Sequence, residues 1–168
     1  MITHGNPAAW FRNSSSGGRC GTTSRLSAFA AALFLVFNPT ATSAHSYELG
    51  DLTVGHIWAP QPVDGSVSIP IYAGVLNSSS KPISLVGATT SVAGTVRIRK
   101  AKNGSVRWPE AIKFEPGRPF ALAPWREHLW VTGLKRLLGE GDSFDLTLDF
   151  GSAGTLDVTV VIESEAGH

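Results

Sequence analysis

The metal chemistry open to this sequence depends on histidine, because sulfur is almost absent. Its 168 residues include five histidines, one cysteine and one methionine. The two sulfur residues, Met1 and Cys20, both lie near the N-terminus. The rest of the chain therefore has no cysteine nucleophile, no CxxC redox pair, no thiolate zinc site and no blue-copper ligation. Three histidines are candidate ligands there, namely His45, His56 and His128.

The first 44 residues have the features of an export signal. Arg12, Arg19 and Arg25 precede an uncharged apolar run over residues 26–37, and small residues follow at 42–44. Because this run is shorter than the roughly 20 apolar residues that span a bilayer, we predict a signal peptide over 1–44 and a mature chain over 45–168. An uncleaved membrane anchor is the alternative. We expect a periplasmic or secreted protein with His45 at its N-terminus and no membrane span after cleavage.

The charge of the predicted mature chain excludes several partners. The leader holds three of the 14 Lys and Arg residues and none of the 13 acids, which leaves 11 against 13, or −2 with His neutral. A nearly balanced surface without a large basic patch is not typical of proteins that bind nucleic acid or anionic membranes. We therefore expect no nucleic-acid partner.

The elements that position these side chains are short strands. Apolar residues alternate with polar ones between turn residues at spacings of roughly 8–12 residues, which is typical of an all-β sandwich or barrel. An Asn103-Gly104 pair predicts a hairpin turn, and Gly133–Leu138 is the one segment expected to form a helical turn. No linker or repeat divides residues 45–168, so one domain is expected. Strands are predicted at 52–58, 67–76, 83–88, 94–100, 106–108, 112–114, 120–122, 128–131, 144–150 and 155–162.

Enzyme signatures are absent from the sequence. It has no Gly-x-Ser-x-Gly elbow, no His-Glu-x-x-His, no phosphate loop and no dinucleotide fingerprint. Asp145 and Asp149 alternate with core residues on one predicted strand, without a partner that would make an acid–base pair. We therefore expect a protein that is not an enzyme.

Several segments together resemble the PCuAC family of periplasmic copper chaperones. The longest is 128–142, which is similar to the family's His-x-Met segment, its Gly-Leu-Lys turn and its Leu-x-Glu-Gly-Asp approach to the penultimate strand. The resemblance covers essentially the whole predicted mature chain. It implies a cupredoxin-like or immunoglobulin-like β-sandwich that binds copper, mainly Cu(I), and delivers it to cytochrome oxidase assembly. The other similar segments are 44–47, 50–54, 56–59, 72–77 and 85–88.

The resemblance also shows which copper ligands are missing. The family's site uses a histidine and methionines from two hairpins, and soft thioethers suit Cu(I). His128 matches the histidine of the His-x-Met pair, whereas Trp130 matches its methionine. Arg99 matches the histidine of the preceding hairpin, and Ala101 and Trp108 match its methionines. Without these ligands, Cu(I) binding at this position should be weak or lost.

Each remaining metal candidate has two interpretations. His128 is either a remnant copper ligand or a structural or surface residue, because one histidine cannot hold a metal alone. His45 is either a Cu(II) chelator, through its imidazole and the free α-amine of the mature chain, or part of a disordered terminus. His56 is expected to pack or to be a satisfied surface residue. Copper is thus the only expected cofactor, with His128 and His45 as its candidate ligands.

A second function is open if the metal is lost. The domain would then be a binding or scaffold module that contacts another exported protein or an oxidase assembly factor. Trp108 and Trp130, expected on neighbouring strands, either fill space left by methionines or form a docking patch. The basic residues of the predicted 94–108 hairpin either face solvent or contact an anion or acidic partner. They are Arg97, Arg99, Lys100, Lys102 and Arg107.

Overall fold

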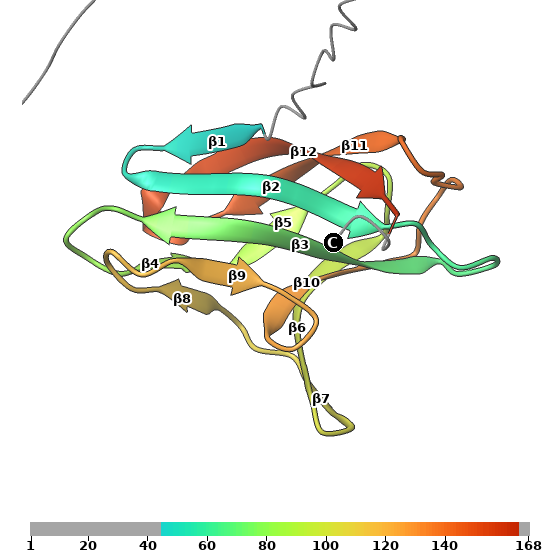
Figure 1. Ribbon diagram of the computed structural model, residues 1–168, viewed down its shortest axis with the longest axis horizontal. Coiled ribbons are helices and arrows are strands. Elements are labelled where there is room, and N and C mark those ends of the chain that lie inside the picture. Colours follow the sequence, from blue (N-terminus) through green and yellow to red (C-terminus); the bar gives the residue numbers. More distant parts are fainter. Residues whose placement is uncertain (1–44, 165–168) are drawn as a thin grey trace, which may run out of the picture. The chain divides into compact units, whose positions relative to one another are not determined.

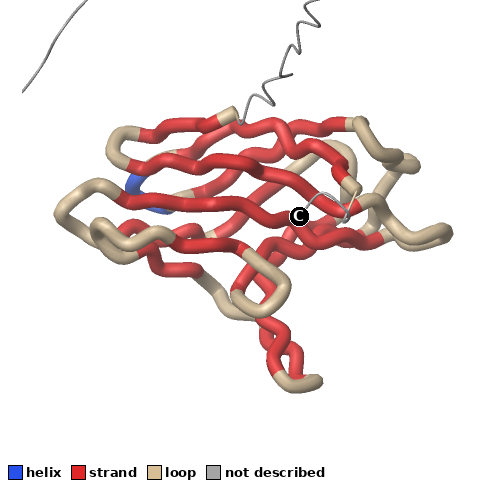
Figure 2. Tube along the Cα trace, viewed as in Figure 1, coloured by secondary structure: helices blue, strands red, loops and turns tan. Residues whose placement is uncertain are grey.

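The computed structural model describes residues 45–164, which form a single all-β domain (Figures 1 and 2). The predicted signal peptide, residues 1–44, and residues 165–168 lie outside the described residues. Within 45–164 no helix is long and apolar enough to cross a membrane. The strands are β1 (Ser46–Leu49), β2 (Leu52–Pro60), β3 (Ser68–Asn77), β4 (Ile83–Leu85), β5 (Gly87–Thr89), β6 (Thr95–Lys102), β7 (Ser105–Arg107), β8 (Ile112–Phe114), β9 (Phe120–Leu122), β10 (Glu127–Thr132), β11 (Ser143–Asp149) and β12 (Thr155–Glu163).

Ten of these strands share one mixed sheet. Its main order is β5-β11-β12-β2-β3-β10-β6-β7, and β1 and β9 add to β2 and β3. β12 and β2 are parallel, while the other neighbours in this order are antiparallel. β4 and β8 form a separate two-stranded sheet. Figure 1 shows the tip of the β6–β7 hairpin projecting from the other strands, and all three residues of β7 are exposed.

The core follows the predicted alternation. Along β11, Leu146 and Leu148 are buried, while Asp145 and Asp149 are exposed. The matching residues of β12 are also buried, as expected from the period-2 pattern of a strand. These residues are Val158, Val160 and Ile162.

The segment 133–138 is not a helix, contrary to the expectation. The one helical element among the described residues is a short 3-10 turn, Gly151–Ala153. The segment begins at Gly133, whose φ of +73° lies outside the right-handed helical region;. The segment is tied to other loops instead, since the Leu134 N–H donates to the Val67 carbonyl and the Lys135 N–H donates to the Val92 carbonyl.

The predicted 83–88 strand is split in two. Residues 83–85 pair with β8, while residues 87–89 pair with β11. Between them, the Val86 N–H donates to the Asp149 carbonyl. The segment therefore passes from the small sheet to the large one, which its continuous β pattern did not indicate.

The end of β3 is anchored by a buried asparagine. Asn77 is fully buried, and its side-chain amide donates to the carbonyls of Phe114 and Lys81, at 3.0 and 2.8 Å. Its side-chain oxygen accepts from the Ser79 N–H and hydroxyl, at 3.0 and 2.6 Å. All the polar atoms of this side chain are therefore satisfied, and they join β3 to the small sheet.

Candidate functional site

The candidate site lies on one face of β10, where that strand runs between β3 and β6. Leu129 and Val131 point into the core and are fully buried. His128 and Trp130 alternate with them and therefore point to the opposite face. On this face the cross-strand partner of His128 is Arg99 of β6. The sheet thus brings together the two positions that the resemblance assigns to copper-binding histidines.

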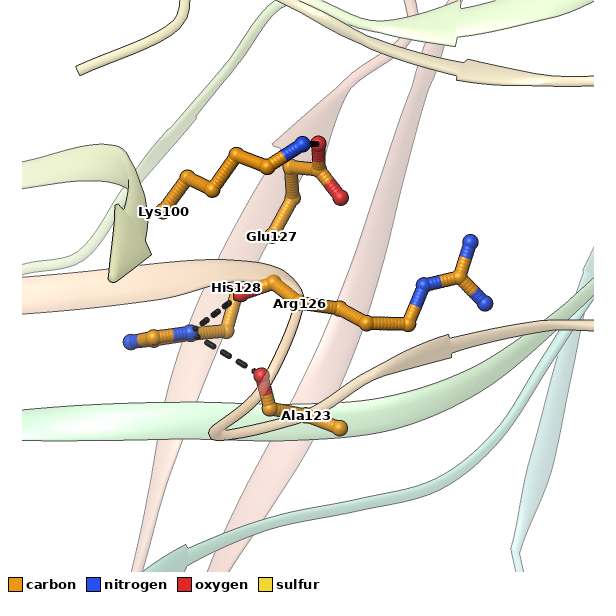
Figure 3. Close-up of polar contacts among 5 residues, drawn as sticks. All are labelled: Lys100, Ala123, Arg126, Glu127 and His128. Atoms are coloured by element: carbon orange, nitrogen blue, oxygen red, sulfur yellow. Dashed lines mark hydrogen bonds and ion pairs between the residues drawn. The ribbon is translucent and has the colours of Figure 1, made fainter. Parts of the chain in front are cut away.

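His128 is a structural residue in this fold. Its side chain is 1% exposed, and Nδ1 lies 3.1 Å from the Ala123 carbonyl and 3.0 Å from the Arg126 carbonyl (Figure 3). Because carbonyls only accept hydrogen bonds, Nδ1 must carry the proton. The structural interpretation is therefore supported, and a surface position for His128 is excluded.

The other ring nitrogen of His128 has no hydrogen-bond partner among residues 45–164. Nε2 is buried and, in the neutral ring fixed by the Nδ1–H bonds, it holds a free lone pair;. Burial lowers the pKa of His128 below its usual 6.5, and the charge of Arg99 lowers it further. The hydrogen bonds to the Arg126 and Ala123 carbonyls oppose this shift. The ring is thus held neutral, which is the form that binds metals.

The Arg99 guanidinium stacks on Trp130, the residue that the resemblance matches to a methionine. The Arg99 guanidinium carbon lies 4.3 Å from the ring centroid of Trp130. A second stack follows toward the hairpin, with Arg97 4.4 Å from the Trp108 ring. Both are cation–π contacts, worth about 0.5–2 kcal/mol each. Trp108 and Trp130 are not on neighbouring strands as expected, because β6 lies between β10 and the end of β7.

The aromatic row continues across the sheet beyond His128. The Tyr72 ring lies edge-on to His128 at 5.6 Å, and Trp58 lies edge-on to Tyr72 at 5.1 Å. His128 and Trp130 are 6.3 Å apart, measured between ring centroids. Tyr72 was not among the candidate site residues expected from the sequence. Its place in the aromatic row depends on the pairing of β3 with β2, which sets Tyr72 opposite Trp58.

The basic residues of the hairpin divide between two faces. Arg107 pairs across the hairpin with Lys100, so it does not share the face of Arg97 and Arg99. Lys100 forms an ion pair with Glu127 (Figure 3). Burial raises the pKa of Glu127, but the hydrogen bond from Lys100, a backbone N–H and the charges of Lys100 and Arg126 lower it overall. Lys102 lies on the same side of the hairpin as Lys100 and Arg107;. These three basic residues line an open hollow of about 440 Å³.

The other predicted ligand, His45, lies away from His128. It is exposed and directly precedes β1, which pairs with β2. β2 and β3 separate β1 from β10 in the sheet order, so the fold does not make His45 and His128 neighbours. His56 is exposed and lies on β2, with Nε2 3.7 Å from a Glu163 carboxylate oxygen. Metal binding by His45 and His128 stays a prediction.

The residues of the β10 face do not fit a Cu(I) site. They supply one imidazole nitrogen and no sulfur, and they place the Arg99 cation beside it. Arginine keeps its charge in proteins and cannot act as a ligand. Among residues 45–164, no group of three His, Cys, Asp or Glu side chains could hold a metal ion.

Fold and site together define a PCuAC-like β-domain. It resembles the apo PCuAC domain from PmoF1, at 28% identity and a TM-score of 0.66 over 71% of this chain and 99% of that one. The copper-bound PCuAC domain from PmoF2 gives 24% and 0.64 over 71% and 98%. The Cu(I) form of DR1885 from Deinococcus radiodurans gives 21% and 0.55 over 75% and 84%. The predicted fold class is confirmed.

The chain belongs to the LpqE-like family. The model of that family, described as "Putative lipoprotein LpqE-like", matches residues 52–162. A curated relative, "Putative lipoprotein Lxx21020" of Leifsonia xyli subsp. xyli (strain CTCB07), is 31% identical over 108 residues. That match covers 61% of this chain and 65% of the relative, so the chain spans just under two thirds of the relative's length. Membership in this family agrees with the expectation that the protein is not an enzyme.

Proposed function

We propose that this chain is an exported, copper-chaperone-like protein that no longer carries Cu(I) in the pocket implied by the PCuAC resemblance. The observation that carries the proposal is the position of Arg99, whose guanidinium stacks 4.3 Å from the Trp130 ring and whose strand position faces His128. A permanent cation and an indole stand at positions matched to a histidine and a methionine. Copper entering there would meet like charge and one nitrogen ligand.

Export is part of the same proposal. The 1–44 segment has the order of a signal peptide, and the relatives' printed descriptions name lipoproteins. In this chain the one cysteine, Cys20, precedes the apolar run, so the thiol that a lipid anchor requires is missing after it. We therefore place the protein in the periplasm or outside the cell, released from its leader. Its partner would be another exported protein or an oxidase assembly factor.

A Cu(I) competition titration tests the proposal. The exported protein should not take Cu(I) from a chelator that buffers the free ion near about 1 µM. A triple variant, Arg99→His with Trp108→Met and Trp130→Met, restores three of the four replaced ligands and should gain Cu(I) binding at least tenfold tighter. The matched control moves the histidine two residues along the same face, as Arg97→His with the same methionines, and should gain much less. A Cu(I) site tighter than about 1 µM in the unaltered protein would overturn the proposal.

A binding or scaffold role is the second candidate, and the exposed aromatic and basic side chains favour it. Trp108 is 40% exposed beside Arg97, and Trp125 is 73% exposed. Tryptophan and arginine are enriched among the residues that dominate interface energies. Co-purification of an exported partner that is lost in Trp108→Ser with Arg97→Gln, but kept in Lys113→Gln, would support this role. Equal retention by both variants would count against it.

A further inference from the structure

Charge is unevenly distributed over this domain. The β6–β7 hairpin, residues 95–107, carries five of the 11 Lys and Arg residues of the predicted mature chain and no acidic residue. The rest of that chain has six basic side chains against 13 acidic ones, or −7 with His neutral. Figure 1 shows the tip of this hairpin extending beyond the other strands. A basic projection from an acidic domain attracts and orients a partner of negative charge.

The strand geometry gathers three of these cations on one side of the hairpin. Ile98 of β6 points into the core and is 4% exposed, and Lys100 and Lys102 follow on the same side of the strand by the period-2 alternation. Arg107 of β7 stands opposite Lys100. Beyond Ile98 this side leaves the core and becomes a surface. The open hollow of about 440 Å³ on it is lined by Lys100, Lys102, Asn103, Ser105 and Arg107.

Two of the three cations in this hollow are not neutralised by the domain itself. Lys100 forms an ion pair with Glu127 of β10 (Figure 3). Lys102 and Arg107 are exposed and form no ion pair within residues 45–164. An arginine can bind a carboxylate through two parallel N–H bonds, and a lysine binds it as a point charge. The hollow can therefore take two carboxylates.

The spacing of these two cations matches an extended chain. Lys102 stands opposite Ser105, and Arg107 stands opposite Lys100, so the two cations are two residues apart along the hairpin. Alternate residues of an extended chain are about 6.6 Å apart and point to the same side. Carboxylates at alternate positions of an extended segment can therefore reach Lys102 and Arg107 together.

The charge of the rest of the domain argues for a narrow partner. A membrane or a nucleic acid is a broad anionic surface, and it would also approach the remaining residues, whose net charge is −7. Interactions between exposed charges are largely screened beyond about 10 Å at 0.1 M salt. A single chain that lies in the hollow contacts the cations and stays clear of most of the acidic side chains.

We propose that this hollow binds an extended acidic segment of another exported protein, with carboxylates at alternate positions on Lys102 and Arg107. The inference rests on the exported partner in the proposed function and names the chemistry of that partner. It does not depend on the Arg99 pocket, because Arg99 lies on the opposite side of β6 from Lys100 and Lys102.

A labelled peptide of alternating glutamate and threonine is the probe. Its fluorescence anisotropy with the exported protein should give a Kd below about 100 µM at low salt. Binding should weaken at least fivefold between about 20 mM and about 200 mM salt, because exposed charges are screened. A peptide with the same residues but all glutamates in one block should bind at least threefold more weakly. No binding of the alternating peptide below about 1 mM, or equal binding of the block peptide, would overturn the proposal.

A matched pair of double variants locates the site. Lys102→Gln with Arg107→Gln should weaken peptide binding at least tenfold. Lys81→Gln with Arg118→Gln removes the same charge from exposed positions outside the hairpin and should weaken it less than twofold. All four positions are exposed, so both variants should keep the urea midpoint of the unaltered protein;. Equal weakening by the two variants would mean that net charge alone attracts the peptide, and would overturn the site.

Two further measurements separate this inference from its alternatives. Phosphatidylglycerol vesicles should not bind the exported protein. Vesicle binding that is lost in Lys102→Gln with Arg107→Gln, without peptide binding, would assign the hollow to a membrane and overturn the proposal. Cu(I) titration of the same samples reports on the Arg99 pocket, since both variants retain Arg99 and His128. Failure of peptide binding with no tight Cu(I) site would leave the proposed loss of Cu(I) intact, whereas a tight Cu(I) site with peptide binding would refute that loss alone.

Discussion

Replacing His128 by alanine should strongly destabilise the domain, although the residue was first considered as a metal ligand. The change removes a fully packed ring and the single Nδ1–H that the carbonyls of Ala123 and Arg126 share, at 3.1 and 3.0 Å. Losing this shared donor costs about 1–2 kcal/mol, and truncating a large buried side chain to alanine costs about 2–3 kcal/mol more. We expect a loss of about 4 kcal/mol in the free energy of unfolding.

Urea denaturation of the exported protein measures this loss without any metal present. Since natural domains are stable by about 5–15 kcal/mol, the variant should unfold at a clearly lower urea concentration or fail to fold. His45→Ala is the control, because His45 is exposed and surface changes usually cost less than about 0.5 kcal/mol;. A His128→Ala loss below about 1 kcal/mol would refute the structural role assigned to this ring.

His128 should also make the stability of the domain depend on pH. The folded state holds the pKa of His128 below its usual 6.5, mainly through burial. The unfolded chain therefore binds this proton more readily, and the stability that the neutral ring contributes is fully present above pH 6.5 and is lost as the pH falls below it. Each unit of pKa difference is worth at most about 1.4 kcal/mol. Wild type should lose more stability than His128→Asn between pH 7.5 and pH 5, and equal losses would contradict the assignment.

Four other substitutions test parts of the fold by urea denaturation. Asn77→Ala should cost about 2–4 kcal/mol, because it leaves the buried Phe114 carbonyl without its donor;; a loss under about 1 kcal/mol would contradict this. Trp130→Ala should lower the free energy of unfolding by about 2–3 kcal/mol, because Trp130 is partly buried;. Trp108→Ala should lower it by less than about 1 kcal/mol, because Trp108 is 40% exposed;. A larger loss in Trp108→Ala than in Trp130→Ala would contradict this packing. Gly104→Ala should lower the free energy of unfolding by about 1 kcal/mol, because the φ of Gly104 is +76°;. An added Cβ there meets nothing within 4 Å, so no steric clash adds to this cost. No loss of stability would mean that the turn is not type I′.

Local patterns predicted the strands and the hairpin turn well. The period-2 alternation along 144–150 and 155–162 depends on one buried face, so each strand carries its own signal. The Asn103-Gly104 pair predicted a turn that needs positive φ at both residues, and the structure has φ of +50° and +76° there. Such features are encoded within a few neighbouring residues.

Features that depend on distant partners were the ones missed. The sequence around His128 is charged, with Arg126 and Glu127, which left a structural role and a surface role both open. Its burial follows from the place of β10 between β3 and β6, where Tyr72 of β3 lies edge-on to the ring at 5.6 Å. The pairing of Arg107 with Lys100 likewise depends on the register of the hairpin, which sets which residues share a side;.

The persistence of His128 without its companions follows from the two faces of β10. Leu129 and Val131 belong to the core, so the sandwich is stabilised on the face that does not contain the pocket. Residues of the opposite face can therefore change without loss of the fold. His128 is the exception, because its Nδ1–H bonds and burial give it a structural role that needs no copper. The likeness to PCuAC domains thus predicts the architecture of this chain, whereas metal binding has to be argued from each side chain in turn.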